Sequence, residues 1–396
     1  MVMSNRIALH VKPAAERALR DGHPWLFDQA IRKQNREGQA GDLAVIFDSK
    51  NRFLAIGLYD PLSPIRVKVL QHQTSTQINA EFFHDRLLKA AQLRESLSAT
   101  QTNGYRLIHG ENDGFPGLVI DRYADTLVIK LYSVAWFPHL RDILSGLDSI
   151  QPAQRWVLRL SRNIDPTSEF FDGAILRGTK PESPLIFEEN GLKFYADVLH
   201  GHKTGFFFDQ RDNRALVGKY ASEIQAASVL DVFSYAGGFS LYAARGGAKH
   251  VVSLDISEPA MQTARQNFAL NPQAVAHTNH ETLVADAFEG MQSLIYKGRT
   301  FDMVIVDPPS FAKSAAEVDR ALVAYNRLAD LAVQLVRRNG LLVMASCSSR
   351  VSADVFFNAI EKGRPLDTIQ QTSHAIDHPI SFPEGAYLKC LFANCR

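Results

Sequence analysis

Residues 228–240 read Ser228-Val-Leu-Asp-Val-Phe-Ser-Tyr-Ala-Gly-Gly-Phe-Ser240, an apolar strand that runs into a glycine turn and then into a helical segment. Four more apolar strands follow, each separated from the next by a helical segment. They are predicted at Val251–Asp255, Thr282–Ala285, Asp302–Val306 and Gly340–Met344. Apolar strands that alternate with helices are typical of a parallel sheet covered on both faces. Residues 191–396 are therefore predicted to form an α/β domain with a Rossmann-like sheet.

Ligands of such sheets bind beyond the carboxyl ends of the strands. The residues at those ends include Asp231, Gly237, Asp255 and Asp286. A glycine lets a ligand approach the backbone, and a carboxylate after the second strand can accept both hydroxyls of a ribose. The turn lacks the G-x-G-x-x-G spacing of a pyrophosphate site, which disfavours NAD(P). S-adenosylmethionine, which carries ribose and adenine without phosphates, fits this pattern, with Asp286 near the adenine amino group.

The last two strand ends carry Asp307-Pro-Pro309 and Ser346-Cys-Ser348. Two prolines stiffen a loop, and its carboxylate can bind the Watson–Crick edge of a base held out of its stack. Phe311 is a candidate for stacking on that base. Carbon 5 of a pyrimidine becomes nucleophilic once a thiolate adds to carbon 6, a role for which Cys347 is the candidate. Asp307 would then hydrogen-bond or protonate ring nitrogen 3. The plainer interpretations are a turn after a buried strand and a cysteine that only fills the core.

Residues 1–75 differ in character from the rest of the chain. They contain short strand-like runs between turn residues and carry 11 Lys/Arg against 7 Asp/Glu. Arg66 and Lys68 alternate with apolar residues, which predicts a strand with one basic face that contacts RNA phosphates. A solvated surface is the alternative. Residues 76–190 combine helical segments with a predicted hairpin and read as a compact α+β module.

Composition excludes several classes of protein. The 396 residues have a net charge of +1, so the total charge indicates no polyanion binding. Three cysteines, Cys347, Cys390 and Cys395, form no C-x-x-C pair, which argues against a disulfide framework and a structural zinc site. No metal site is predicted. No apolar run is long enough to span a membrane, and the first residues lack a signal-peptide core. We therefore expect a cytoplasmic protein.

Several long motifs resemble the 23S ribosomal RNA cytosine-5 methyltransferases of the RlmI type, and the likeness covers nearly the whole chain. The motifs are Gly22-His-Pro-Trp-Leu-Phe27, Gly110-Glu-Asn-Asp-Gly-Phe-Pro-Gly117, His200-Gly-His-Lys-Thr-Gly-Phe-Phe-Phe-Asp-Gln-Arg211, Phe233-Ser-Tyr-Ala-Gly-Gly-Phe239, Asp307-Pro-Pro309, Ser346-Cys-Ser348 and Pro383-Glu-Gly-Ala-Tyr-Leu-Lys389. The resemblance implies a PUA-like RNA-binding β-barrel over residues 1–75, a central α+β domain over 76–190 and a class I methyltransferase domain over 191–396. It also implies ribosomal RNA as the partner and Cys347 as the nucleophile.

From the strand ends and this resemblance we assign roles to individual residues. S-adenosylmethionine contacts are assigned to Gln210, Arg211, Asp231, Phe233, Gly237, Asp255, Asp286 and Asp307. Catalysis is assigned to Cys347 and Asp307, and RNA contacts to Arg66, Lys68 and Phe311. Two positions depart from the family, since Ser310 and Ser349 stand where members carry Lys and Gly. Ser310 is a candidate helper in releasing the cysteine.

Two other functions remain open. One is methylation of a base nitrogen, because Asp307-Pro-Pro-Ser-Phe-Ala-Lys313 also resembles a domain that forms 7-methylguanine. That domain lacks the cysteine, so Cys347 favours cytosine. The other is a non-catalytic RNA-binding assembly factor, against which the intact strand-end aspartates argue. The sequence leaves the target nucleotide, the base that removes the carbon-5 proton and the oligomeric state open, with a homodimer among the options.

Overall fold

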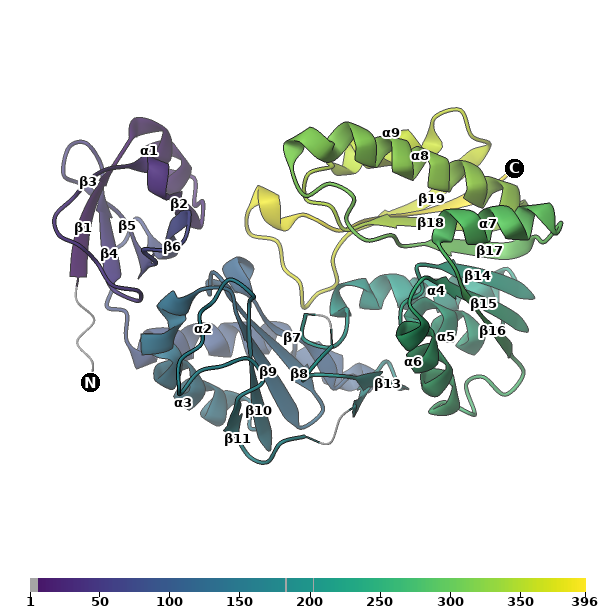
Figure 1. Ribbon diagram of the computed structural model, residues 1–396, viewed down its shortest axis with the longest axis horizontal. Coiled ribbons are helices and arrows are strands. Elements are labelled where there is room, and N and C mark those ends of the chain that lie inside the picture. Colours follow the sequence, from purple (N-terminus) through teal and green to yellow (C-terminus); the bar gives the residue numbers. More distant parts are fainter. Residues whose placement is uncertain (1–5, 182–183, 202) are drawn as a thin grey trace. The chain divides into compact units, whose positions relative to one another are not determined.

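The computed structural model describes residues 6–181, 184–201 and 203–396, and the chain divides into two compact units (Figure 1). Unit 1 comprises residues 1–189, 196–206 and 376–385, and unit 2 comprises residues 190–195, 207–375 and 386–396. The first two predicted domains thus share unit 1, together with two segments of the expected catalytic part. The domain boundaries after residues 75 and 190 stay a prediction.

Unit 1 begins with a six-stranded sheet in the order β2-β6-β5-β4-β1-β3. Its strands are β1 (Arg6–Val11), β2 (Trp25–Phe27), β3 (Ile31–Gln34), β4 (Leu43–Phe47), β5 (Phe53–Tyr59) and β6 (Ile65–His72). β1 and β4 are parallel, and the other neighbours are antiparallel. Helix α1 (Pro13–Arg20) has a proline in its first turn, where no backbone donor is lost, and Leu19 near its end packs into the core.

The second sheet of unit 1 has five strands in the order β11-β10-β9-β8-β7. They are β7 (Gly104–His109), β8 (Leu118–Tyr123), β9 (Thr126–Leu131), β10 (Arg155–Leu160) and β11 (Ile175–Arg177). Helices α2 (Ala80–Leu93) and α3 (Leu140–Ile150) pack against each other, and both contribute to one apolar core with the sheet. The hairpin of β8 and β9 was predicted. Helix α2 ends at Leu93, and residues 95–100 form a 3-10 turn.

Unit 2 is built on a seven-stranded sheet in the order β16-β15-β14-β17-β18-β20-β19. Its strands are β14 (Ser228–Val232), β15 (His250–Asp255), β16 (Asn279–Val284), β17 (Phe301–Val306), β18 (Val336–Ser346), β19 (Leu366–Thr372) and β20 (Lys389–Cys395). The first five strands in the order are parallel, and β20 is antiparallel to both of its neighbours. This topology confirms the predicted α/β fold. Strands β12 (Leu185–Glu189) and β13 (Leu192–Ala196) precede it and form a two-stranded sheet.

Six helices cover the two faces of this sheet (Figure 1). Helices α4 (Arg211–Glu223), α5 (Gly238–Arg245) and α6 (Glu258–Ala269) follow one another on one face. Helices α7 (Ala287–Tyr296), α8 (Val318–Leu335) and α9 (Ala353–Glu361) share an apolar core with the other face. Within the described part of the chain, no helix combines the length and the apolar character that a membrane crossing demands.

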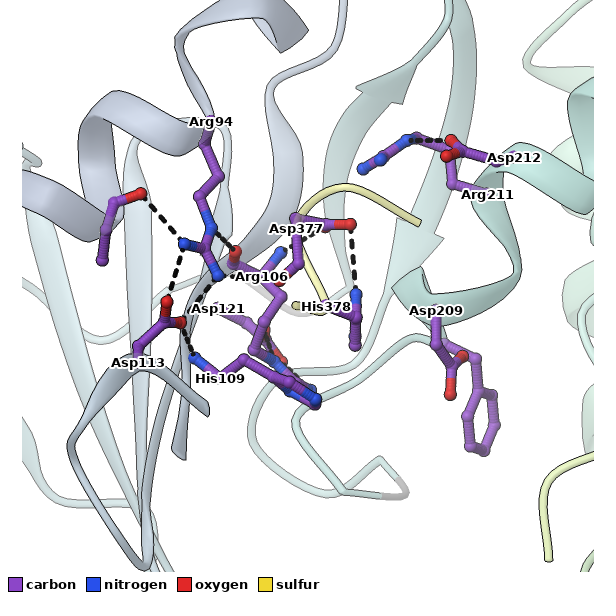
Figure 2. A network of polar contacts seen from close by, with 12 residues as sticks. Arg94, Arg106, His109, Asp113, Asp121, Asp209, Arg211, Asp212, Asp377 and His378 are labelled. Atoms are coloured by element: carbon purple, nitrogen blue, oxygen red, sulfur yellow. Dashed lines mark hydrogen bonds and ion pairs between the residues drawn. The ribbon is translucent and has the colours of Figure 1, made fainter. Parts of the chain in front are cut away.

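A buried polar network lies inside unit 1 (Figure 2). The guanidinium of Arg94 is fully buried and donates to both carboxylate oxygens of Asp113, at 3.0 and 2.7 Å. It also donates to the backbone oxygens of Ala90, Arg106 and Asp377, at 3.0, 3.0 and 2.9 Å. Every one of its nitrogens therefore has an acceptor, as a buried guanidinium requires.

The same network anchors residues 376–385, a segment that lies far along the chain. The backbone N–H of Arg106 donates to Asp377 Oδ2 at 2.9 Å, and the rings of His109 and His378 lie 4.7 Å apart. Further along the segment, the Phe382 ring packs at 5.2 Å against Trp25 of β2. Residues 376–385 therefore belong to unit 1 through buried contacts with both of its sheets.

The network generates a prediction about stability. Asp113→Ala leaves the buried Arg94 guanidinium without its carboxylate, which should lower the free energy of unfolding by about 3–5 kcal/mol. The matched control is Asp367→Ala, which removes an exposed ion pair with Arg396 and should lower the free energy of unfolding far less, because water screens exposed charges. Urea unfolding of the two variants measures the difference, and equal losses would contradict a stabilising role for the network.

Candidate active site

The carboxyl ends of the five parallel strands meet at one edge of the unit 2 sheet. Asp231 is the next-to-last residue of β14, and Asp255 is the last residue of β15. Asp286 lies two residues after the end of β16. Asp307 and Cys347 come directly after β17 and β18. The residues that the sequence predicts as strand-end groups therefore occupy the same edge, with Asp307 and Cys347 on paired strands.

The turn after β14 has an unusual backbone. Phe233, Tyr235 and Gly237 have φ values of +63°, +48° and +73°, which lie in the left-handed region. Such values are costly for residues with a side chain and persist where the surrounding structure enforces them. A Cβ added at Gly237 would lie 2.9 Å from the Cβ of Ala264, so a larger residue does not fit. The turn therefore holds a strained shape at the place where the sequence predicts cofactor contacts.

Asp255 fixes this turn. Its Oδ2 accepts a hydrogen bond from the backbone N–H of Tyr235 at 2.9 Å, and its Oδ1 accepts one from Ser257 N–H at 2.9 Å. Each carboxylate oxygen has further acceptor capacity. Asp255 therefore holds the turn after β14 in shape and can still accept hydrogen bonds from hydroxyl groups of a ligand.

Asp231 is a fully buried carboxylate. Its Oδ2 accepts hydrogen bonds from the backbone N–H of Ser240 at 3.0 Å and from the Ser240 hydroxyl at 2.7 Å. Its Oδ1 has no hydrogen-bond partner among the described residues. Burial raises the pKa of Asp231 to about 7, and the nearby carboxylates of Asp307 and Asp255 add to the rise, while the bonds from Ser240 oppose it. A buried carboxylate with an unused oxygen is typical of a functional site.

Asp286 begins helix α7. Its Oδ1 accepts from the backbone N–H groups of Phe288 and Glu289, at 2.9 and 3.3 Å. This is an N-cap, which satisfies two donors of the first helical turn. One carboxylate oxygen has a structural role, and the predicted contact with adenine stays a prediction.

Asp307 and Cys347 lie on neighbouring loops. The backbone N–H of Asp307 donates to Val232 O of β14 at 3.3 Å, which ties the Asp307 loop to the cofactor side of the sheet. Cys347 is half-buried, and its Sγ lies 4.0 Å from Pro308 O, within reach for a thiol donor. The other two cysteines are buried, and burial raises the pKa of the Cys390 thiol well above its usual range. Cys347 is thus the partly accessible thiol of the three.

Side chains around Cys347 hold its loop in place. The Tyr325 hydroxyl of α8 and the Ser346 hydroxyl are hydrogen-bonded at 2.8 Å, and both groups are buried. The hydroxyls of Ser310 and Ser348 both donate to Ala312 O, each at 3.2 Å. Ser310, the candidate helper in releasing the cysteine, therefore already donates its hydroxyl hydrogen bond to a backbone oxygen.

The other residues predicted for the site differ in their burial and in their contacts. Phe311 is half-buried, packs on the core of the sheet and lies 5.2 Å from the Tyr325 ring. Gln210 and Arg211 are buried at the start of α4, where Gln210 accepts from Asn213 at 2.6 Å and Arg211 pairs with Asp212 at 3.1 Å (Figure 2). His202 of the same motif lies outside the described residues. Among the described residues no group of three metal-ligand side chains occurs.

The predicted basic face of β6 needs a correction. Lys68 is 5% exposed, and its ammonium pairs with Asp60 at 3.4 Å and donates to Ile65 O at 3.1 Å. Arg66 is half-buried, donates to Pro61 O and Asp60 O, and faces Asp28 at 3.9 Å. Alternation along a strand predicts which side chains share a face, but here Asp60 takes up the Lys68 ammonium, and the stem of Lys68 lies beside Gly117. Lys68 is therefore unavailable to a phosphate.

Sequence reasoning missed three residues that shape the site. Ser240 binds Asp231, Tyr325 binds Ser346, and Lys389 donates to Ser348 O beside Cys347. Ser240 lies nine residues after Asp231 and Tyr325 lies 21 residues before Ser346, so no spacing rule indicates these contacts. Lys389 did carry a signal, because a lysine that opens the apolar run Cys390–Ala393 must find acceptors once the strand is buried.

Comparison with known proteins adds independent information. Residues 9–72 match the family of PUA-like domains, and residues 105–392 match the family of S-adenosylmethionine-dependent methyltransferases. A ribosomal RNA large subunit methyltransferase of Deinococcus radiodurans is 46% identical over 98% of this chain and 97% of its own. The ribosomal RNA large subunit methyltransferase I of Shewanella denitrificans is 38% identical over 98% of this chain and 99% of its own.

Solved structures share the fold at lower identity. A protein from Streptococcus mutans described as a SAM-dependent methyltransferase superposes with a TM-score of 0.82 at 22% identity, and the alignment covers 98% of this chain and 99% of that protein. A methyltransferase solved in complex with SAH superposes with a TM-score of 0.83 at 22% identity, covering 98% of this chain and 100% of its own. The arrangement of sheets described above is therefore the one found in these proteins.

The buried carboxylate leads to a prediction about pH. The folded-state pKa of Asp231 is about 7 and the ordinary value is 3.8, so between these values the native state holds a proton that the unfolded chain has released. The contribution of Asp231 to stability is therefore complete below pH 3.8 and is lost as the pH rises to about 7. Asp231→Asn should flatten the pH dependence over this window and should be more stable than the wild type at pH 8.

Thermal unfolding of both proteins between pH 4 and pH 8 measures this effect. The relevant quantity is the difference between the two proteins, because other carboxylates titrate equally in both. A difference that stays constant across the window would contradict the burial of a protonated Asp231.

Proposed function

Because this chain belongs to the family of S-adenosylmethionine-dependent ribosomal RNA large subunit methyltransferases, we propose that it forms 5-methylcytosine in 23S ribosomal RNA. The observation that carries this proposal is the pair of loops after β17 and β18. They hold Asp307 and the half-buried thiol of Cys347 beside the strand ends assigned to the cofactor. A PUA-like domain in the same chain supports an RNA substrate.

The residues at the strand ends fit the cofactor by charge and by shape. Asp231, Asp255 and Asp307 lie near enough for the latter two to raise the pKa of the first, so this edge of the sheet has a negative potential. A sulfonium ion is cationic and suits such a potential. Gly237 preserves the shape of the turn, because a side chain there would meet Ala264, and Asp255 keeps acceptor capacity for ribose hydroxyls. When bound, S-adenosylmethionine supplies an electrophilic methyl group.

We assign the following steps to the residues of the chain. The Cys347 thiolate adds to carbon 6 of the cytosine, a C–S bond forms, and the electron pair of the 5,6 double bond becomes available at carbon 5. For this step Asp307 must be in its protonated form, in which it donates a hydrogen bond or its proton to ring nitrogen 3 and offsets the charge created by the addition. After carbon 5 has gained the methyl group, loss of its proton to a base restores the double bond and expels the thiolate.

Two residues complete the proposed site. Phe311, half-buried beside Tyr325, is proposed to contact the target base with its accessible edge. Ser310 is a weaker candidate for release, since its hydroxyl donates to Ala312 O. Methylation of a base nitrogen needs no covalent adduct, and the trapping experiment below separates the two reactions.

The cofactor assignment predicts a loss of affinity. Asp255→Ala removes an acceptor for the ribose and should weaken S-adenosylmethionine binding by about 1.5–3 kcal/mol, the range for hydrogen bonds to a charged group. Because Asp255 also accepts from Tyr235 N–H, Asp255→Asn serves as the matched control that keeps one oxygen acceptor. Calorimetry measures both, and unchanged affinity in a folded Asp255→Ala protein would remove the ribose assignment.

The mechanism predicts a trapped adduct. Substrate RNA that carries 5-fluorocytidine has no proton on carbon 5, so the bond between Cys347 and carbon 6 should persist after methyl transfer. With S-adenosylmethionine, the wild type should give a denaturation-resistant protein–RNA band, and Cys347→Ala should give none. Cys395→Ala serves as the control and should give the wild-type band, because that cysteine ends the antiparallel strand β20, at the edge of the sheet opposite Cys347.

Two outcomes would contradict the proposal. One is methylation activity that survives in Cys347→Ala, which would indicate attack by a ring or exocyclic nitrogen. The other is a wild-type enzyme that methylates cytosine RNA yet gives no band with the fluorinated substrate. Mass spectrometry of the product nucleoside identifies the methylated atom in either case.

A further inference from the structure

Lys389 is a buried lysine next to the Cys347 loop. It is the first residue of β20, is 2% exposed and lies opposite Ser346 in the antiparallel register of β18 and β20. Ser346 is the residue before Cys347. The side chain of Lys389 therefore starts from the strand that borders the proposed nucleophile.

The ammonium group of Lys389 has only backbone acceptors. It donates to Ser348 O, to Val351 O at 2.5 Å and to Tyr387 O at 3.1 Å, which uses its three protons. Two of these oxygens belong to the chain just after Cys347, so the ammonium closes the turn that carries the thiol. Among the described residues no carboxylate lies within ion-pair distance of Lys389. A buried cation usually has an anionic partner.

The electrostatic partner of Lys389 is the thiol. Burial lowers the pKa of Lys389 to about 8, and the charge of an ionised Cys347 acts in the opposite direction. Such an interaction is reciprocal, since a thiolate that favours the ammonium is itself favoured by the ammonium. Asp307 follows β17, the strand paired with β18, and Tyr325 of α8 interacts electrostatically with Cys347; burial raises the pKa of Tyr325 to about 12, so it stays neutral. Lys389 is the cationic group among them.

We propose that Lys389 is the positioning residue of the site, which holds the Cys347 turn by its three backbone hydrogen bonds and stabilises the thiolate with its buried charge. The inference rests on the proposed function for its purpose, because a thiolate is needed only if Cys347 acts as a nucleophile. The proposal can still be tested without RNA, because it concerns the ionisation of one thiol in the free protein.

Thiol alkylation by iodoacetamide across pH 6–10 tests the proposal without RNA or cofactor. Peptide mapping after trypsin isolates Cys347, because cleavage at Arg350 separates it from Cys390 and Cys395. The wild-type midpoint for Cys347 should lie below about 8.5, the ordinary value for a free cysteine. A midpoint at or above that value would overturn the proposal without any variant.

Variants separate charge from shape. Lys389→Met keeps the length of the side chain and removes the charge, so the midpoint should rise by about one pH unit and the alkylation rate at pH 7 should fall about tenfold. Lys389→Arg keeps the charge and should restore most of the reactivity. Lys219→Met, which removes an exposed lysine of α4, is the matched control and should leave the midpoint unchanged.

The outcomes distinguish this proposal from the proposed function. A folded Lys389→Met protein, as judged by S-adenosylmethionine binding, with a wild-type midpoint would overturn the role of Lys389 and leave cytosine methylation intact. A shifted midpoint together with an absent RNA adduct in the wild type would support Lys389 and contradict the methylation mechanism. If Lys389→Met does not fold, the wild-type midpoint and the Lys389→Arg protein decide the question.

Discussion

The strained turn over residues 233–237 is the constraint on which the candidate site depends. Phe233 and Tyr235 adopt left-handed backbone conformations that an isolated peptide would leave. The Asp255 carboxylate, which accepts from Tyr235 N–H, supplies a hydrogen bond that compensates part of that cost. The turn thus draws its shape from the end of a neighbouring strand. Parallel pairing of β14 with β15 is what brings that carboxylate into place.

The same edge of the sheet is polarised. Asp231 and Asp255 lie at the ends of β14 and β15, and the buried ammonium of Lys389 lies on β20, on the far side of Cys347. A cationic methyl donor and an anionic nucleophile need opposite potentials, and in water the two would be screened. Burial of Asp231 and of Lys389 preserves the contrast, because desolvated groups are screened less. Asp231 shows the free-energy cost of burying a charge, because burial raises its pKa to about 7.

Part of this arrangement could be predicted from sequence because parallel strands obey a simple rule. Apolar runs between helices indicate the sheet, and the rule that ligands bind beyond the carboxyl ends singles out Asp255, Asp307 and Cys347. Side-chain burial in a mixed sheet follows no such rule. Lys68 was predicted at the surface, yet it is buried and its ammonium pairs with Asp60, the residue after β5. The order of β19 and β20 was also missed, since strand order at a sheet edge is set by long-range packing.

The C-terminal motif shows why local patterns fall short. Pro383 to Lys389 reads as one motif, yet the residue just before it, Phe382, packs on Trp25 in unit 1, and its last residue, Lys389, donates to Ser348 O in unit 2. Neither partner is near in sequence, so no periodicity could indicate either contact. The chain passes from unit 1 to unit 2 after Gly385, inside the motif. Contacts of this kind are set by the tertiary fold, and a local pattern alone cannot assign them.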